Sequence, residues 1–584
     1  MRNTTTIKKL CMLISLISVI LCIGCGREVE ENNTYMDLNT YFGMQDVTNN
    51  EVCVIIIDNV VVGRGIIRED KNIYIPYDIV RSTINNKFYV DNKENLLIYS
   101  TPTQVFDSVI GSDVYSSDVA SKYEKTISFI ENDVVYISLD YCMHMGKTVN
   151  YTMAFEPNRL VITTILNNTV ATVKEDAKVR YEANNNSDVL FDAKSDSEVF
   201  VLSKEGEYTK VADGTGIVGY IANDKLSDTI ERMNTIDYTP LVYEHNTRDF
   251  TICLAWHQLG SKVPKGILTR DMEGTKSVNV ISPTWYEIKD NEGDFSSIAS
   301  KEYIEEAHGL GLEVWGLISD FRYDDTSKGY YINQVINKTS TRRKLIDNLI
   351  KEAIDMDLDG INIDFEKISS ANGESFVQFI RELSIECRKL DIVLSVDMYV
   401  PIESNLYYDR ASVGEAADYV IVMGYDEHWA GCGSAGSTAS IGFVTDGIKN
   451  TLLEVEPSRV INAIPFYTRV WKEIPEELAG PDDEIIEDSV FGNYALSSFA
   501  VGMGTAKSYL SKNGATPVWL DECGQYYGEY KKDGVTYRIW LEEEESTKLK
   551  LNVMKEYNLG GVACWKLGLE EKEIWTVIEE YVNK

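Results

Sequence analysis

The sequence predicts an α/β protein whose largest part is a (β/α)8 TIM barrel with an α+β insertion, preceded by a small α+β domain and a small all-β domain. Over roughly the last 340 residues, apolar segments of strand length alternate with segments whose apolar residues recur at helical spacing. Polar residues follow several of these strands, where barrel enzymes carry their chemistry. The eight strand candidates are 251–256, 278–282, 313–318, 360–365, 392–399, 419–424, 460–466 and 561–567.

Composition narrows the classes of protein. The chain has 584 residues, 44% hydrophobic and 25% charged, which is typical of globular proteins. Its formal net charge of −36 disfavours a nucleic-acid partner, because phosphate binding needs a basic surface. The ten cysteines form no C-x-x-C pair after residue 25, and the five histidines have no paired spacing. We therefore expect neither a metal site nor a cofactor.

The N-terminus has the pattern of an export signal. Residues 1–25 combine a basic start with an apolar run, too short to span a membrane comfortably. Residues 23–25 (Ile-Gly-Cys) resemble the end of a bacterial lipobox, which implies lipidation of Cys25 and attachment to the outer face of the cell membrane. Cys22 departs from that pattern, so an uncleaved anchor or plain secretion to the wall or spore stays open. Residues 26–50 read as a flexible tether.

Two small domains are predicted before the barrel. Residues 51–166 contain a weak internal repeat, in which 74–78 (YIPYD) echoes 136–140 (YISLD). The region resembles the N-terminal domain of copper amine oxidases, although His144 stands alone and predicts no copper. Residues 168–228 resemble a bacterial SH3-like domain, with Tyr208 where the family commonly has Trp. Cell-wall targeting and a passive spacer are both compatible with this pattern.

The segment 360–366 (GINIDFE) carries the polar groups most costly to bury. Alternation along a strand places Asn362, Asp364 and Glu366 on one side. Crowded carboxylates push each other's pKa values apart, so that one can serve as a general acid. A solvated edge strand is the alternative. The helical pattern 341–356, with Thr339 or Ser340 as its cap, and a second apolar stripe over 376–390 favour a buried parallel strand instead.

These residues resemble the D-x-x-D-x-D-x-E signature of glycoside hydrolase family 18. Asp359, Asp364 and Glu366 match it, whereas Asn362 replaces the middle Asp. Further segments resemble the ends of barrel strands six to eight in family order: 423–426 (MGYD), 464–467 (IPFY) and 560–565 (GGVACW). The resemblance covers roughly residues 245–584, with an insertion at about 470–545 that walls one side of a cleft.

The resemblance implies a substrate-assisted mechanism without a protein nucleophile. Glu366 would protonate the glycosidic oxygen, Asp364 would bind the acetamido N–H, and Tyr425 would donate to the acetamido oxygen. Trp565 would form the floor beneath the reacting sugar. The candidates for substrate binding are Asp359, Asn362, Met423, Asp426, Tyr467, Trp565 and Trp285. For Asp359 a purely structural role is equally compatible.

Asn362 is the main departure from the signature. Without the charge of the middle Asp, its amide is expected to donate to Asp364, which should then ionise more readily. Asn362 together with Phe365, the segment 281–286 (ISPTWY) and the segment 537–546 resemble the YaaH-like branch of spore-cortex and peptidoglycan N-acetylglucosaminidases.

The sequence thus predicts a glycosidase that hydrolyses β-1,4 N-acetylglucosaminyl linkages in peptidoglycan or spore cortex. The expected partner is this polysaccharide, with membrane contact only through a lipid anchor. A chitinase would use the same residues on another polymer. A non-catalytic glycan-binding barrel is the alternative from another class, although the presence of Glu366 argues against it.

Overall fold

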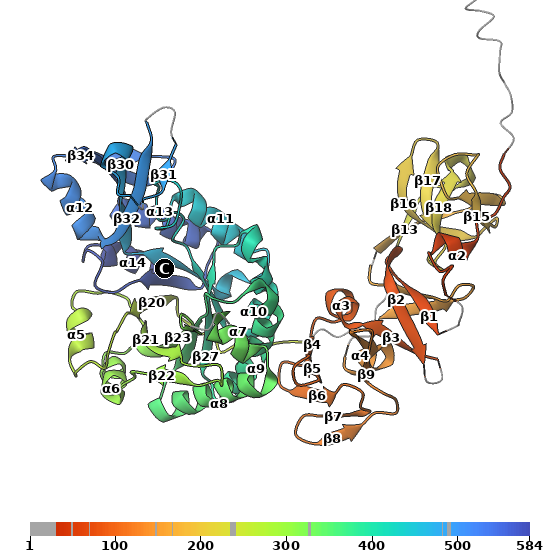
Figure 1. Cartoon of the computed structure of the whole chain (residues 1–584), viewed down its shortest axis with the longest axis horizontal. Helices are drawn as coiled ribbons and strands as arrows, with labels where there is room; N and C mark the ends of the chain where they lie inside the picture. The colour runs from red at the N-terminus through yellow and green to blue at the C-terminus, as the bar shows by residue number, and fades with distance from the viewer. Residues whose placement is uncertain are drawn as a thin grey trace, which may run out of the picture. The chain divides into compact units, whose positions relative to one another are not determined.

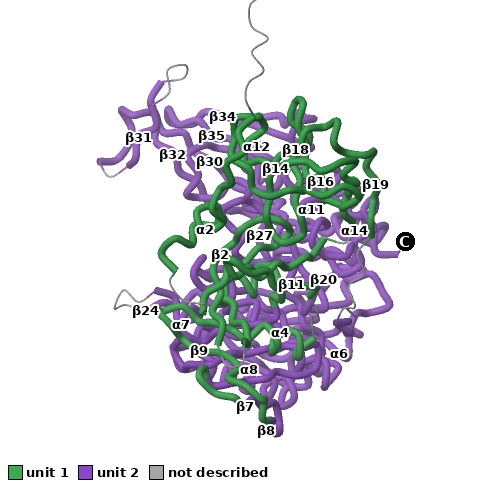
Figure 2. Tube along the Cα trace, turned by 90° about the vertical axis from the view of Figure 1, so that its right-hand side faces the viewer, with its two compact units in different colours: residues 1–86, 110–114, 122–239 green, residues 87–109, 115–121, 240–584 purple. Residues whose placement is uncertain are grey.

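The computed structural model describes residues 31–47, 51–68, 71–146, 149–165, 167–233, 241–324, 329–481, 483–487 and 492–583. The predicted signal segment and Cys25 lie outside these residues. The chain divides into two compact units, shown in different colours in Figure 2. Unit 2 comprises residues 87–109, 115–121 and 240–584, and unit 1 comprises the rest. No helix among the described residues is long and apolar enough to cross a membrane.

The predicted barrel is confirmed. Eight parallel strands close on themselves, because the first strand pairs with both the second and the last. Every predicted strand segment overlaps one of the eight. Figure 1 shows helices surrounding this sheet. In barrel order the strands are β20 (Ile252–His257), β21 (Val280–Ile288), β23 (Glu313–Ser319), β26 (Gly360–Asp364), β27 (Val393–Tyr399), β28 (Tyr419–Met423), β29 (Val460–Pro465) and β36 (Gly561–Trp565).

The helices cover the barrel with their apolar faces. In α8 (Thr339–Met356), Leu345, Leu349 and Ala353 recur at helical spacing and are buried. The helix ends where Asp357 adopts a left-handed conformation (φ 65°). The other barrel helices are α5 (Ile267–Asp271), α6 (Lys301–Gly309), α7 (Tyr331–Ile336), α9 (Gly373–Lys389), α10 (Arg410–Ala416), α11 (Ile441–Thr451), α13 (Glu544–Glu556) and α14 (Ile574–Val582).

The barrel interior is filled with side chains. Alternate residues of the strands point inward, as parallel strands in a closed barrel require. The inner cluster consists of Ile252, Leu254, Trp256, Val280, Trp315, Leu317, Val393, Tyr419, Ile421, Ile461, Ala463 and Ala563. Polar groups placed on this face must therefore bond each other or reach the open end of the barrel.

An antiparallel lobe is inserted between β29 and α13. Its six strands are ordered β31-β32-β30-β35-β34-β33, and α12 (Met503–Lys512) packs on them through Ala506 and Leu510. The extra strands expected at 518–520 and 535–540 are β33 and β35. The strands are β30 (Tyr467–Pro475), β31 (Ile485–Ile486), β32 (Tyr494–Gly502), β33 (Val518–Leu520), β34 (Gln525–Lys532) and β35 (Val535–Trp540).

Unit 1 contains two seven-stranded sheets. In the first, β3 (Asn72–Pro76) pairs with β10 (Val134–Ser138), so the two copies of the internal repeat lie side by side. The second sheet consists of the seven strands that follow each other in the sequence from β13 (Asn167–Thr172) to β19 (Ile230–Met233). The likeness of these regions to amine-oxidase and SH3-like domains stays a prediction.

The N-terminal segment differs from the expected flexible tether. From residue 31 onward it is ordered against the second sheet, where Tyr35 bridges Val189. The buried guanidinium of Arg180 donates to the carbonyl of Asn32 at 2.7 Å. Phe42 is buried in an apolar cluster with residues of the first sheet. The apolar residues between 35 and 44 provide the burial that a flexible segment lacks.

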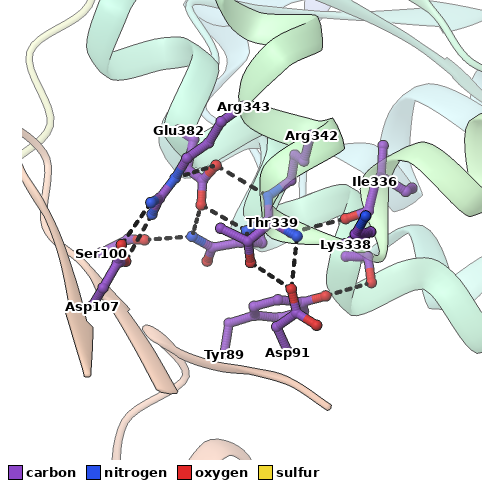
Figure 3. Close-up of polar contacts among 12 residues, drawn as sticks. Tyr89, Asp91, Ser100, Asp107, Ile336, Lys338, Thr339, Arg342, Arg343 and Glu382 are labelled. Carbon is purple, nitrogen blue, oxygen red and sulfur yellow. Dashed lines mark hydrogen bonds and ion pairs between the residues drawn. The ribbon is translucent and has the colours of Figure 1, made fainter. Parts of the chain in front are cut away.

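Residues 87–109 belong to unit 2 and pack on two barrel helices. They form β4 (Phe88–Asp91), β5 (Leu96–Ser100) and β6 (Val105–Val109), the start of a five-stranded sheet that β7 (Val114–Ser116) and β8 (Ala120–Lys122) complete. Figure 3 shows the polar contacts, in which Asp91 meets Thr339 of α8 and Asp107 pairs with Arg343. These contacts join the barrel to chain located about 250 residues earlier.

Candidate active site

The segment 360–366 forms β26 and the turn after it, and its side chains alternate between the two faces of the strand as predicted. Ile361, Ile363 and Phe365 point outward into the core beneath the helices. Asn362 and Asp364 point inward, and Glu366 follows the strand at the C-terminal mouth of the barrel. This end of a barrel collects functional groups from several strands.

The backbone around Glu366 is clamped by Asp320, which follows β23. Its carboxylate accepts the N–H groups of Glu366 at 3.0 Å and of Lys367 at 2.9 Å. Tyr408 donates to the carbonyl of Phe365 at 3.1 Å. Burial raises the pKa of Asp320 to about 7. Sequence reasoning missed Asp320, although its place just after an apolar strand was a usable signal.

Glu366 is held in a half-buried position. The hydroxyl of Tyr399, at the end of β27, donates to Oε2 of Glu366 at 2.5 Å. Lys367 Nζ lies 3.9 Å from the same oxygen, and 23% of the Glu366 side chain is exposed. Burial, then the neighbouring Glu366 charge, raises the pKa of Tyr399 above its ordinary value, so its hydroxyl stays a donor. The carboxyl is thus oriented yet accessible, as a general acid requires.

Asn362 does not donate to Asp364, and this expectation was wrong. Its side chain is fully buried, with Trp256 and Ser282 donating to Oδ1 at 2.9 and 3.0 Å. Its amide donates instead to Asp397 Oδ1 at 2.8 Å, and also to Ser395 at 3.1 Å. All four contacts are with protein, so Asn362 is no substrate ligand either. The reason is that it lies one inward position deeper in the barrel than Asp364.

The easier ionisation of Asp364, relative to a site with three Asp residues, stays a prediction. Burial raises the pKa of this carboxyl well above its ordinary value, and the charges of Glu366 and Asp397 add to the effect. Only 7% of Asp364 is exposed. Asp397 is a second inward carboxyl that sequence reasoning missed. Its alternation with Ser395 and Tyr399 along β27 was the available signal.

Side chains at the ends of two further strands, β28 and β29, complete the mouth. Tyr425 follows β28, and its ring meets that of Tyr467 edge-on at 6.1 Å. The Tyr467 hydroxyl donates to Asp426, which has a positive φ of 59°. Met423, the last residue of β28, is 6% exposed. Burial, then Tyr467, raises the pKa of Tyr425 well above its ordinary value, so it also stays a donor.

A pocket of about 350 Å³ opens beside Asp364. Asp364 and Trp565 both line it, together with Thr284, Leu317 and Phe321. The ring of Trp565 packs edge-on against that of Trp256, with 5.7 Å between the ring centroids. The pocket therefore joins a buried carboxyl to an aromatic wall, an arrangement suited to an amide-bearing sugar.

Of two further predicted substrate residues, Asp359 lies away from the pocket, and Trp285 lines it with little exposed surface. Asp359 precedes β26, at the end of the barrel opposite to Glu366, where it accepts the N–H of Val314 at 2.8 Å and lies 2.9 Å from His308 Nε2. It stabilises this end and cannot reach the pocket. Trp285 touches the pocket wall but is only 3% exposed, because its ring packs against Tyr303. It has no free face for a sugar.

The geometry suits acid–base chemistry on a bound sugar. Glu366, Asp364, Tyr425, Asp426, Tyr467 and Trp565 lie at the mouth. Asp359 lies at the far end of the barrel, the amide of Asn362 bonds protein groups, and Trp285 is buried. In the part of the chain that the structure describes, no group of three or more His, Cys, Asp or Glu side chains is placed to hold a metal ion.

The barrel region is similar to known proteins. Residues 323–570 match the family model described as Glycosyl hydrolases family 18. The "Uncharacterized glycosylase YvbX" of Bacillus subtilis is 26% identical over 317 residues, which cover 52% of this chain and 84% of the relative. The "Cortical fragment-lytic enzyme" of Bacillus anthracis is 24% identical over 42% of this chain, and the chain spans only 55% of that relative.

A solved structure gives a fold comparison. The structure titled "C-terminal domain of putative chitinase" from Desulfitobacterium hafniense aligns with a TM-score of 0.49 and 21% identity, covering 57% of this chain and all of that chain.

Proposed function

We propose that the chain is a glycosyl hydrolase of family 18, whose model matches residues 323–570, and that it hydrolyses β-1,4 N-acetylglucosaminyl linkages of peptidoglycan or spore cortex. The observation that carries the proposal is the placement of Glu366 at the mouth, held by Tyr399 next to the pocket that Asp364 and Trp565 line. A glycosidase is indicated because one accessible acid sits beside a nearly buried carboxyl and an aromatic wall.

In the proposed mechanism the substrate supplies the nucleophile. Glu366 protonates the glycosidic oxygen while the 2-acetamido oxygen of the same sugar attacks the anomeric carbon. Asp364 accepts a hydrogen bond from the acetamido N–H and stabilises the positively charged oxazolinium ring that forms. Tyr425, whose hydroxyl keeps its proton, donates to the acetamido oxygen. Glu366 then removes a proton from water, which opens the ring and restores the acid.

The choice of polymer is supported by the relatives and by the sequence. One relative is named as a cortical fragment-lytic enzyme. The segments 281–286 and 537–546 resemble the same branch. We place the protein outside the cytoplasm, lipid-anchored through Cys25 or secreted, on the pattern of residues 1–25. A chitinase is the second candidate, since the residues around the reacting sugar would be the same.

The test is product analysis with residues 26–584. Wild type, Glu366→Gln and the surface control Glu386→Gln would be incubated with decoated spore cortex, vegetative peptidoglycan and chitin. New reducing ends would be counted and the fragments identified by mass spectrometry. We expect wild type and the control to release fragments with N-acetylglucosamine at the new reducing end. Glu366→Gln should be at least 100-fold slower, because the proton donor is lost.

Each outcome decides between the candidates. Faster cleavage of chitin than of both wall polymers would favour the chitinase. If wild type and Glu366→Gln bind glycan but leave all three polymers intact, the protein is a binding module and the proposal fails. If Glu366→Gln cleaves glycan as fast as wild type, Glu366 is not the general acid.

A further inference from the structure

Strands β26 and β27 pair their inward side chains in successive levels. The register places Asn362 beside Ser395 and Ile363 beside Val396. The next residues along the two strands are Asp364 and Asp397, the charge of Asp397 acts on Asp364, and neighbouring strands are roughly 4.8 Å apart. At the level above, Tyr399 donates to Glu366. Toward the mouth, the amide of Asn362 beside the hydroxyl of Ser395 is thus followed by the two carboxyls of Asp364 and Asp397. The carboxyl of Glu366 beside the phenol of Tyr399 comes last.

The two carboxyls of the middle level have little charge compensation. Asp397 is 4% exposed and accepts one hydrogen bond, from the neutral amide of Asn362. Within the described residues, no Lys or Arg nitrogen lies within ion-pair distance of Asp364 or Asp397. Neighbouring titratable groups are Glu366 and Lys367 after β26, Asp320 after β23, Tyr399 on β27 and Tyr425 after β28.

A buried pair of carboxyls in this setting cannot carry two negative charges. Burial penalises the charged forms, and like charges this close repel each other strongly. Burial raises the pKa of Asp397, and Glu366 raises it further, in the same direction as for Asp364. Such a pair titrates as a unit that holds one proton over a wide pH range.

We propose that Asp364 and Asp397 share one proton, with Asp397 as a positioning residue. Asp397 supplies a buried carboxyl from β27, whereas the family signature carries this carboxyl at the position of Asn362. Asn362 keeps a structural part, because its amide holds Asp397 Oδ1 in place. The carboxyl has moved to the neighbouring strand, one inward level closer to the mouth.

The shared proton gives Asp364 two states during the reaction, which is where the inference depends on the proposed function. Before bond cleavage the proton lies between the two carboxyls. As positive charge develops on the acetamido group, the proton moves to Asp397 and the negative charge falls on Asp364. The pair gains and loses no proton, so the step needs no co-reactant. Asp397 itself does not touch the substrate.

Three variants of residues 26–584 test the proposal. Asp397→Asn removes the carboxyl, and Asn362→Asp with Asp397→Asn moves it back to the signature position. Ser395→Ala is the matched control, since it removes another partner of the Asn362 amide without changing any charge. The first readout is kcat/KM against pH on the polymer that wild type cleaves. The second is the infrared band of protonated carboxyl groups between pH 5 and 8, which requires no activity.

We expect wild type to show at pH 7 the infrared band of a carboxyl that shares its proton, and Asp397→Asn to shift this band, since the proton then belongs to Asp364 alone. Asp397→Asn should lose 10- to 100-fold in kcat/KM with a displaced pH profile. The double variant should recover at least tenfold, and Ser395→Ala should keep the wild-type pH profile.

The opposite results would overturn the proposal. A wild type without a protonated carboxyl at pH 7 excludes the shared proton, even if Asp397→Asn fails to fold. An Asp397→Asn variant with reduced rate but an unchanged pH profile would make Asp397 purely structural. If wild type cleaves no glycan, the proposed function fails, while the difference between the infrared bands of wild type and Asp397→Asn still decides whether the proton is shared.

Discussion

At the scale of single residues, the site is governed by four carboxyl groups with different surroundings. Glu366 is partly exposed and bonded to a phenol, whereas Asp364 and Asp397 are buried on neighbouring strands. Asp320 accepts two backbone N–H groups and holds the turn that carries Glu366. Environment rather than residue type therefore separates the roles of these acids.

Replacement of Tyr399 by Phe should slow the proposed reaction about 10-fold, because a hydrogen bond to a charged group contributes roughly 1.5–3 kcal/mol, part of which is regained from water. The loss should fall on kcat and leave KM nearly unchanged, since Tyr399 acts through Glu366. Steady-state kinetics on soluble glycan fragments would measure it, with Tyr537→Phe in the inserted lobe as control. A rise in KM alone would mean that Tyr399 serves binding.

Asp320 predicts a pH dependence of stability. Its pKa of about 7 in the folded chain lies above its ordinary value, so the folded state binds more protons than the unfolded one between about pH 4 and 7. Its contribution is therefore complete below about pH 4 and is lost as the pH rises through 7. Thermal unfolding of Asp320→Asn should depend less steeply on pH than that of wild type across this window. Parallel curves for the two proteins would contradict the prediction.

At the scale of elements, α8 is capped by residues that no local pattern indicates. We expected Thr339 or Ser340 to cap it, but the helix begins at Thr339, and Lys338 before it provides no side-chain cap. Asp91 instead accepts the N–H of Thr339 at 2.7 Å, and Glu94 accepts that of Ser340 at 2.8 Å. Two carboxylates thus meet the positive end of the helix dipole.

Asp91→Ala should destabilise unit 2 by about 1–2 kcal/mol, the usual cost of a lost helix cap. Hydrogen exchange would detect the change as faster exchange in the first turn of α8. Glu556→Ala, at the exposed end of α13, serves as control. Unchanged exchange at α8 would show that water replaces the cap without loss.

The pair Arg342–Glu382 joins α8 to α9 in the core, with side chains 0% and 4% exposed. Arg342→Met should cost about 3–5 kcal/mol, because it leaves the Glu382 charge buried without its main partner. The double change Arg342→Met with Glu382→Leu should regain most of the loss. Thermal unfolding of the single and double variants measures both effects, and equal instability of the two would contradict the charge argument.

At the scale of the whole molecule, the barrel packs against residues that lie far before it in the sequence. Besides capping α8, residues 87–109 bring Ser100 to the amide of Gln378 at 2.8 Å and Asp107 to Arg343 at 2.7 Å, all within unit 2 (Figure 3). A fragment that starts at residue 245, where the sequence pattern of the barrel begins, loses these partners. The polar groups of Gln378 and Arg343 would then face water or stay unpaired.

We therefore expect residues 245–584 alone to unfold several degrees below residues 26–584. The shift should exceed that of Asp91→Ala in the longer chain, because several contacts are lost together. Calorimetry of the two proteins under the same buffer would measure it. Identical unfolding temperatures for the barrel transition would show that residues 87–109 add nothing to its stability.

The sequence by itself determined the eight strands, their inward and outward faces, and the position of Glu366 at the mouth. These features depend on local periodicity, which repeats every two residues in a strand and every three to four in a helix. Only the tertiary structure decided that the Asn362 amide bonds Asp397, that Asp359 lies at the far end of the barrel, and that Asp91 caps α8. Each of these depends on which distant segments meet, and hydrogen-bond partners brought together by folding leave no periodic trace in the chain.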